Sequence, residues 1–364
     1  MGNKAMNKKV YLEMLRIIAC GMVIFNHLPG FRYYYFVSGK RQFLSICISA
    51  IVKSAVPIFF MISGAVLLGR EDEWLMVIKK RAIRVLFIIF LFEFLVMSIV
   101  KIKSVQNGVD YEYTFSAYFR GALCNSIEGA GAYWYLYSYL GLLLVLPMMQ
   151  RVAQHITKIE MHALILLHFV KCSFLPIVNE FMRIKQMPTY SLNDAFYIPF
   201  AFSAPFFFTL LGFYLDNHVD ITKIKLRHLA EFTIVLAGVL LITYRCVYAQ
   251  GNINGEFTED YIAIFDYVIA IYAFVLAKYL WIKGNVMANE SKLAQIVCFC
   301  GSLTFGIYLF DPCIKKFLYI GMESWVDNRA SALIVGFMWV IVSMILGGTI
   351  IWALKKIPGV RKFI

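Results

Sequence analysis

Three ionisable side chains lie within one apolar run near the start of the chain: Glu13, Arg16 and His27. Arg16 and His27 are eleven residues apart, which is about 1100° of helical rotation, so a helix places both on one face about 16 Å apart. Glu13 precedes Arg16 by three residues and can pair with its guanidinium. The spacing predicts a helical stripe with a fixed cation and a titratable base.

The chemistry of this stripe depends on His27, because histidine is the commonest general base in enzymes. A structural alternative is that His27 only hydrogen-bonds a neighbouring helix while Arg16 extends to an interface. An imidazole in an apolar helix has few structural uses that Asn or Ser would not serve. We therefore predict His27 as a catalytic residue, assisted by Arg16 and Glu13.

The next apolar run contains Lys53, Pro57, Ser63 and Gly64. A proline frees a backbone carbonyl, and a Ser-Gly pair lets two helices approach closely. A kinked packing helix therefore accounts for Pro57, Ser63 and Gly64. It does not account for Lys53, which is a second candidate for binding or catalysis.

A tyrosine-rich run begins at Tyr133 and continues with Trp134, Tyr135, Tyr137 and Tyr139. Such residues also form ordinary belts at membrane interfaces. Tyr135 and Tyr139 share one helical face, and Tyr133 and Tyr137 share another, so one pair is expected to face inward and orient a hydroxylated acceptor. The sequence does not decide which pair.

Two later polar residues, Tyr308 and Asp311, lie near the end of another apolar run. Asp311 precedes Pro312, so it either contributes to a site or caps and breaks the helix. We include both residues among the candidates for acceptor binding.

The elements that position these residues are membrane-spanning helices. The chain is 61% hydrophobic and only 16% charged, which leaves too little polar surface for a soluble fold of 364 residues. A span needs about 20 mainly apolar residues. We predict an all-α polytopic bundle of about ten spans in a single domain, residues 1–364, with spans near 10–30, 43–69, 81–101, 131–150, 162–179, 195–215, 229–249, 260–282, 293–314 and 331–354.

The net charge of +13 does not indicate a nucleic-acid partner, because the basic residues cluster between apolar runs. Such clusters are typical of the cytoplasmic loops of membrane proteins. Their distribution favours cytoplasmic N- and C-termini in a cell membrane, with the Lys79–Arg84 cluster inside. The eight cysteines are mostly in apolar segments and lack zinc-type spacing, so we expect no metal.

Together these residues resemble the membrane-bound acyltransferase-3 family. The resemblance covers essentially the whole chain. It is carried by the order and spacing of Glu13-x-x-Arg16 and His27, Lys53-x-x-x-Pro57 with Ser63-Gly64, Lys80-Arg81-x-x-Arg84, Trp134-x-Leu136, and Phe305-Gly-Ile-Tyr308-Leu309.

The resemblance implies a ten-helix bundle that takes acyl-CoA, usually acetyl-CoA, from the cytoplasm and modifies a sugar or other hydroxylated acceptor on the far side. By this likeness His27 matches the catalytic histidine and Arg16 the arginine of the family's R-x10-H signature. Two positions depart from the family. Many members that are fused to an extracellular esterase-like domain have a carboxylate where Tyr139 stands, and many members have His where Asp311 stands.

On this reading the donor is bound by Lys53, Ser63, Arg81 and Arg84, because arginine suits phosphate contacts. The acceptor is bound by Trp134, Tyr135, Tyr137, Tyr139, Tyr308 and Asp311. Transfer is either direct, with His27 deprotonating the acceptor hydroxyl, or passes through an acyl-imidazole.

Two other classes of function stay open. Kinked spans with buried charges also suit a transporter or flippase. The other alternative is that the chain is the membrane module of a longer resistance protein that handles an amino acid, as in membrane-bound serine racemases, whose membrane part resembles this family.

Overall fold

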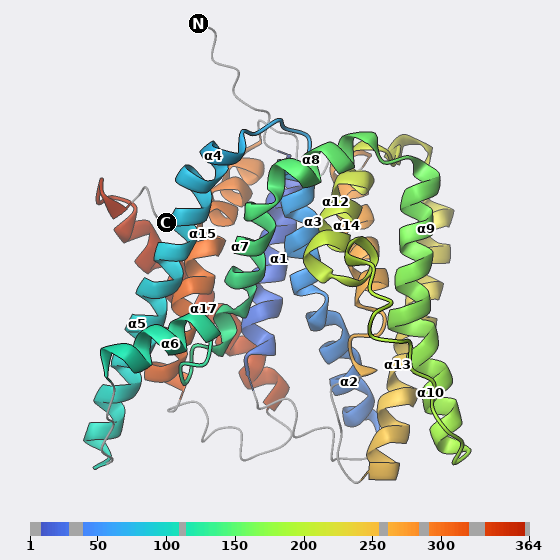
Figure 1. Cartoon of the computed structure of the whole chain (residues 1–364), viewed down its shortest axis with the longest axis horizontal. Coiled ribbons are helices and arrows are strands. Elements are labelled where there is room, and N and C mark those ends of the chain that lie inside the picture. Colours follow the sequence, from blue (N-terminus) through green and yellow to red (C-terminus); the bar gives the residue numbers. More distant parts are fainter. Residues whose placement is uncertain are drawn as a thin grey trace, which may run out of the picture. The chain divides into compact units, whose positions relative to one another are not determined.

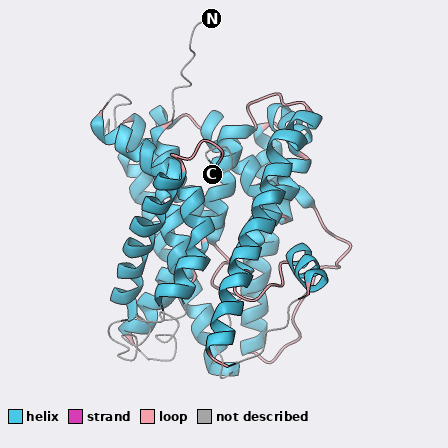
Figure 2. Ribbon diagram, turned by 90° about the vertical axis from the view of Figure 1, so that its left-hand side faces the viewer, coloured by secondary structure: helices cyan, strands magenta, loops and turns pink. Residues whose placement is uncertain are grey.

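The computed structural model describes residues 9–28, 39–108, 114–254, 261–283, 291–319 and 332–360. Within these ranges the chain is helical and contains no strand (Figure 2). The predicted all-α fold is therefore confirmed. The described residues form two compact units, and the boundary between them falls after α1 and again within α15.

Unit 1 comprises the described parts of residues 1–26, 32–70 and 149–302 (Figure 1). Its helices are α1 (Val10–Asn26), α2 (Lys40–Lys53), α3 (Ala55–Leu67), most of α8 (Leu146–His155), α9 (Lys158–Phe169), η4 (Val170–Phe174), α10 (Leu175–Ile184), α11 (Pro199–Phe202), α12 (Ala204–Asn217), η5 (Ile221–Lys223), α13 (Leu226–Asn254), α14 (Asp266–Ile282) and the first half of α15 (Lys292–Ile314).

Unit 2 comprises the described parts of residues 27–31, 71–148 and 303–364. Its helices are α4 (Trp74–Val77), η2 (Ile78–Ala82), α5 (Ile83–Gln106), α6 (Phe115–Cys124), η3 (Gly131–Tyr133), α7 (Trp134–Leu144), the second half of α15, η7 (Lys315–Tyr319) and α17 (Ala332–Leu354). The single domain that we predict stays a prediction.

Among the described residues, six helices are long and apolar enough to cross a membrane, or seven if the bent pair 131–144 and 146–155 forms one span. The predicted spans at 10–30, 195–215 and 260–282 correspond to the shorter helices α1, α12 and α14, of 17, 14 and 17 residues. A multi-span helical membrane protein is confirmed. The count of ten requires the bent pair and these three helices to cross as well.

Two of the helix breaks follow from proline. Pro57 has no N–H for the carbonyl four residues earlier, at Lys53, and the helix is interrupted there: α2 ends at Lys53 and α3 begins at Ala55. A second break lies beside Pro205, where Ser203 separates α11 from α12.

The closest helix crossing in unit 1 joins α3 and α12 through two glycines. A Cβ added to Gly64 would lie 1.8 Å from the carbonyl oxygen of Thr209, and one added to Gly212 would lie 2.0 Å from that of Met61. Only glycine fits at this separation, which confirms the close helix approach predicted from Ser63-Gly64.

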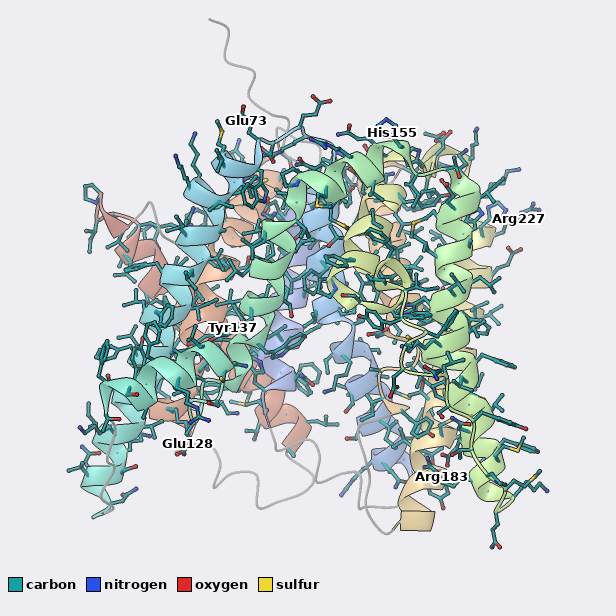
Figure 3. All side chains as sticks on the ribbon, viewed as in Figure 1. Glu73, Glu128, Tyr137, His155, Arg183 and Arg227 are labelled. Carbon is teal, nitrogen blue, oxygen red and sulfur yellow. The ribbon has the colours of Figure 1, made fainter. Side chains whose placement is uncertain are left out.

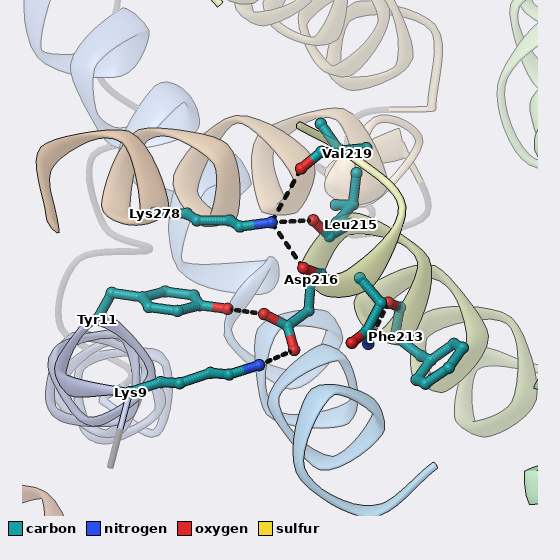
Figure 4. A network of polar contacts seen from close by, with 8 residues as sticks. Lys9, Tyr11, Phe213, Leu215, Asp216, Val219 and Lys278 are labelled. Carbon is teal, nitrogen blue, oxygen red and sulfur yellow. Dashed lines mark hydrogen bonds and ion pairs between the residues drawn. The ribbon is translucent and has the colours of Figure 1, made fainter. Parts of the chain in front are cut away.

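Both ends of unit 1 carry polar side chains (Figure 3). His155 and Arg227 lie at one end and Arg183 at the other. At the end where α1 begins, the buried carboxylate of Asp216 accepts hydrogen bonds from Lys9 Nζ and Tyr11 Oη (Figure 4). Lys278 Nζ donates to the backbone carbonyls of Leu215, Asp216 and Val219, at 2.8, 2.7 and 3.0 Å. This network ties α1 and α14 to the C-terminal end of α12, where carbonyls lack helical partners.

Candidate active site

His27, the residue directly after α1, is hydrogen-bonded to Asp311 of α15. The distance from His27 Nδ1 to Asp311 Oδ2 is 2.9 Å. The other carboxylate oxygen, Oδ1, accepts a hydrogen bond from Ser343 Oγ of α17, also at 2.9 Å. The Asp311 side chain is 1% exposed and that of His27 is 19% exposed. Three segments of unit 2 thus form a line of Ser, Asp and His.

Local backbone structure places Asp311 and supports His27. Pro312 cannot donate to the carbonyl four residues earlier, and α15 passes into the π-helical turn η7 from Lys315 onward. From this turn Lys315 Nζ donates a hydrogen bond to the backbone carbonyl of His27. The ammonium group therefore satisfies a carbonyl at the end of α1, where helices lack partners for their last carbonyl groups.

The contact with Asp311 determines which nitrogen of His27 can act as a base. A carboxylate only accepts hydrogen bonds, so Nδ1 must carry the proton in this contact. Nε2 then has the free lone pair. A carboxylate in this position also stabilises the imidazolium that forms when Nε2 takes a proton. The arrangement has the chemistry of a general base with a fixed tautomer.

Tyr133 of η3 and Tyr308 of α15 form reciprocal hydrogen bonds between these two helices, close to Asp311. The hydroxyl of Tyr133 donates to the carbonyl of Leu309 and that of Tyr308 donates to the carbonyl of Ala132, both at 2.7 Å. Their rings meet edge to face with centroids 6.2 Å apart. Since both hydroxyls are committed to backbone carbonyls, the two side chains hold η3 and α7 against α15.

The other tyrosines of α7 point to two different environments. Tyr135 and Tyr139 are half-buried and stack on each other at 6.1 Å, and Tyr135 also packs against Tyr308. Tyr137 Oη donates to Glu93 Oε1 of α5 at 2.6 Å, and Figure 3 shows its position on α7. The pair 135/139 is thus connected to the aromatic group around Tyr308, as is fully buried Tyr133 of the other pair. Which pair orients an acceptor stays a prediction.

Glu13 and Arg16 form the predicted ion pair within α1, in unit 1. Arg16 Nη1 lies 3.0 Å from Glu13 Oε1. Glu13 also explains a glycine in α15, because a Cβ added to Gly301 would lie 2.3 Å from Glu13 Oε2. The guanidinium is therefore oriented by a buried carboxylate. The shared face of Arg16 and His27 stays a prediction.

The other predicted site residues lie in several places. Ser63 Oγ donates to the carbonyl of Phe59 in its own helix, and Lys53 is half-buried at the end of α2. Arg81 is paired with Asp72, with Nη1 to Oδ2 at 2.9 Å, so a donor phosphate would have to compete with that carboxylate. Arg84 is half-buried, and Trp134 is 47% exposed.

Sequence reasoning missed three residues that the structure makes prominent: Glu93, Lys315 and Ser343. Glu93 is fully buried in α5, and its Oε2 has no hydrogen-bond partner among the residues that the structure describes. The sequence could have indicated Glu93 as a candidate, because it is an acidic residue in the middle of an apolar span. Ser343 and Lys315 gave no such signal, because serine is common in membrane helices and Lys315 lies at a span end.

The long apolar helices define an integral membrane protein, in which Asp311 holds the His27 imidazole in one orientation. The family model of acyltransferase 3, described as an acyltransferase domain, matches residues 9–353. The chain therefore belongs to the acyltransferase-3 family. Comparison with curated proteins and with solved structures gave no significant match.

Proposed function

We propose that the protein transfers an acetyl or other short acyl group from cytoplasmic acyl-CoA to a hydroxyl group of a cell-envelope carbohydrate or related acceptor. Family membership supports acyl transfer. The observation that carries the catalytic assignment is the Ser343–Asp311–His27 hydrogen-bonded line.

In this mechanism Nε2 of His27 takes the proton of the acceptor hydroxyl while the oxygen attacks the carbonyl carbon of the thioester. The new C–O bond forms, the C–S bond breaks, and the thiolate leaves and is protonated to free CoA. Asp311 holds Nδ1 and stabilises the imidazolium, and half-buried Tyr135 and Tyr139 orient the acceptor. Arg16, Lys53, Ser63, Arg81 and Arg84 are the candidates for binding the donor.

The same geometry serves a covalent route in which Nε2 attacks the thioester, the C–S bond breaks and CoA leaves as a thiolate that is protonated. The acceptor hydroxyl oxygen then attacks the acyl-imidazole, the acyl–N bond breaks, and His27 is restored when the hydroxyl loses its proton. The two routes differ in one observable. Only the covalent route labels His27 when the protein is given radiolabelled acetyl-CoA without acceptor and is then quenched.

The test of the assignment compares His27→Ala with His155→Ala. His155 is an exposed histidine whose Nδ1 lies 2.8 Å from the carbonyl of Arg151 in its own helix, so it serves as the matched control. Membranes containing each variant are given radiolabelled acetyl-CoA, and label in envelope glycans is counted. We expect background transfer for His27→Ala and wild-type transfer for His155→Ala.

Wild-type acetylation by His27→Ala would overturn both routes, provided that the variant is present in the membrane at the normal level. Mass spectrometry of the envelope glycans, with and without the protein, identifies the acceptor in the same experiment.

A further inference from the structure

The short helix α6 of unit 2 has one apolar face that is largely exposed. Phe115, Phe119 and Leu123 are 81%, 46% and 57% exposed. They lie at positions i, i+4 and i+8, so they form one stripe along the helix. An open groove of about 470 Å³ runs along this face.

A polar stripe runs beside the apolar one. Ser116, Arg120 and Cys124 also line the groove and are displaced by about 100° from Phe115, Phe119 and Leu123, respectively. The two stripes together cover about half of the helix circumference. α6 is therefore amphipathic on its exposed side, with one cation in the polar stripe.

The opposite face of α6 anchors it to the protein. Gly121 and Ala122 are buried, Tyr118 Oη donates to the carbonyl of Phe90 in α5 at 2.7 Å, and Tyr137 of α7 contacts the carbonyl of Ala122. Asn125, in the left-handed conformation with φ 50°, ends the helix. The groove thus belongs to a helix that is fixed on its other side.

The apolar stripe of α6 continues onto a membrane-spanning segment. The ring of Phe119 stacks on Phe90 of α5, with centroids 5.2 Å apart and planes 22° apart. Phe87 and Phe94 of the same segment, which is apolar enough to cross the bilayer, are 50% and 49% exposed. The apolar stripe of α6 is therefore continuous with the exposed apolar side of a segment that can cross the bilayer.

We propose that α6 is an interfacial helix that binds a membrane phospholipid. The acyl chain lies on Phe115, Phe119 and Leu123, and the lipid phosphate contacts Arg120, with Ser116 as a second donor. Amphipathic helices at the bilayer boundary bind by this combination of apolar burial and attraction to anionic lipid. Arginine suits phosphate oxygens because its planar fork can donate two hydrogen bonds.

The first test identifies what covers the groove in the intact membrane. A photoreactive benzoylphenylalanine is placed at Phe115, a conservative change at an exposed aromatic position, and the full-length protein is irradiated in membranes. Peptide mass spectrometry is expected to find residues 115–124 with a phospholipid adduct whose headgroup is removed by phospholipase. A product of twice the protein mass, or adducts to other proteins without lipid, would overturn the proposal.

The second test addresses the phosphate contact. Native mass spectrometry measures binding of phosphatidylglycerol to the purified protein, comparing Arg120→Gln with Arg227→Gln, an exposed arginine of α13 (Figure 3). Loss of a charge-assisted phosphate contact is expected to weaken binding of one lipid about tenfold in Arg120→Gln. Binding should be unchanged in Arg227→Gln. Equal binding by Arg120→Gln and the wild type would contradict a phosphate contact at Arg120.

Discussion

At the scale of single residues, the buried carboxylate of Asp311 decides what His27 can do. It fixes the proton on Nδ1, and because the Asp311 side chain is 1% exposed, water competes little for this contact. Ser343 satisfies the other oxygen, so the carboxylate is not left half-solvated. A histidine held in this way presents one basic nitrogen in one direction.

Asp311→Asn tests this role with almost no change of shape. The amide can donate to Nδ1 and favour the wrong tautomer, and it no longer stabilises the imidazolium. We expect kcat for acyl transfer to fall about a hundredfold to ten-thousandfold, with KM for acetyl-CoA little changed. Initial rates in membranes at several acetyl-CoA concentrations measure both.

Ser343→Ala provides the graded comparison. It removes one hydrogen bond to Asp311 and leaves the charge, so a loss of about fivefold to tenfold is expected. If Asp311→Asn were no slower than Ser343→Ala, Asp311 would be a structural residue and not the partner of a catalytic base.

The residues that sequence reasoning could place are those with local partners. Glu13 and Arg16 are one helical turn apart, so their spacing alone predicts the ion pair. His27 and Asp311 are separated by 284 positions, and no periodicity relates them. For the same reason the sequence could propose two tyrosine pairs in η3 and α7 but could not choose between them, because their partners Tyr308 and Glu93 lie in other helices.

At the scale of elements, the crossing of α3 and α12 depends on the absence of side chains at Gly64 and Gly212. Gly64→Ala would place a methyl group 1.8 Å from the backbone oxygen of Thr209, and no rotamer change can relieve contact with backbone. We expect the helices to separate and the free energy of unfolding to fall by about 1–3 kcal/mol or more. The thermal unfolding midpoint in detergent measures the change.

Gly141 of α7 is the matched control, because a Cβ added there meets nothing within 4 Å. Gly141→Ala is expected to raise stability by about 0.5–1 kcal/mol, since alanine favours a helix interior. A fall of equal size in both variants would mean that the effect at Gly64 has nothing to do with the crossing.

The polar network around Asp216, at the C-terminal end of α12, is a second feature that positions helices, because it holds α1 and α14 against α12. Asp216→Ala leaves the buried hydroxyl of Tyr11 without its acceptor and removes the partner of half-exposed Lys9. We expect a loss of about 1–3 kcal/mol in the free energy of unfolding, mostly from Tyr11, because the exposed part of the ion pair is screened. Thermal unfolding in detergent is again the measurement.

Asp194, in an exposed turn between α10 and α11, provides the comparison for charge removal alone. Asp194→Ala should leave the unfolding midpoint close to that of the wild type. If the two aspartate variants unfolded at the same temperature, the network in Figure 4 would not hold α1 in place.

At the scale of the whole molecule, composition and apolar runs were sufficient to predict a helical membrane protein, because a bilayer permits few other solutions. Composition and apolar runs were less informative about the length of each helix and about where a helix is broken. Length alone separates α1, α12 and α14 from the six longer helices, and Ser203 splits the run that we predicted as a sixth span. Proline and glycine chemistry explains such breaks, but the final helix lengths depend on tertiary packing.

The orientation of the bundle is the prediction that belongs to this scale. The basic residues favour cytoplasmic termini, which places the chain between α12 and α13 inside the cell and the chain between α10 and α11 outside. Both connections in unit 1 contain exposed residues, at His218 and at 185–197, and such loops accept insertions. An epitope tag after His218 and another after Tyr190 can therefore report the two sides independently.

Antibody binding to intact and to permeabilised cells is the measurement. We expect the tag after Tyr190 to be detected on intact cells and the tag after His218 only after permeabilisation, with acyl transfer retained in both to show that the bundle is intact. The reverse pattern would place the Lys79–Arg84 cluster and the predicted donor site on the wrong side of the membrane for cytoplasmic acyl-CoA. In that case the donor would have to be an acyl carrier outside the cytoplasm.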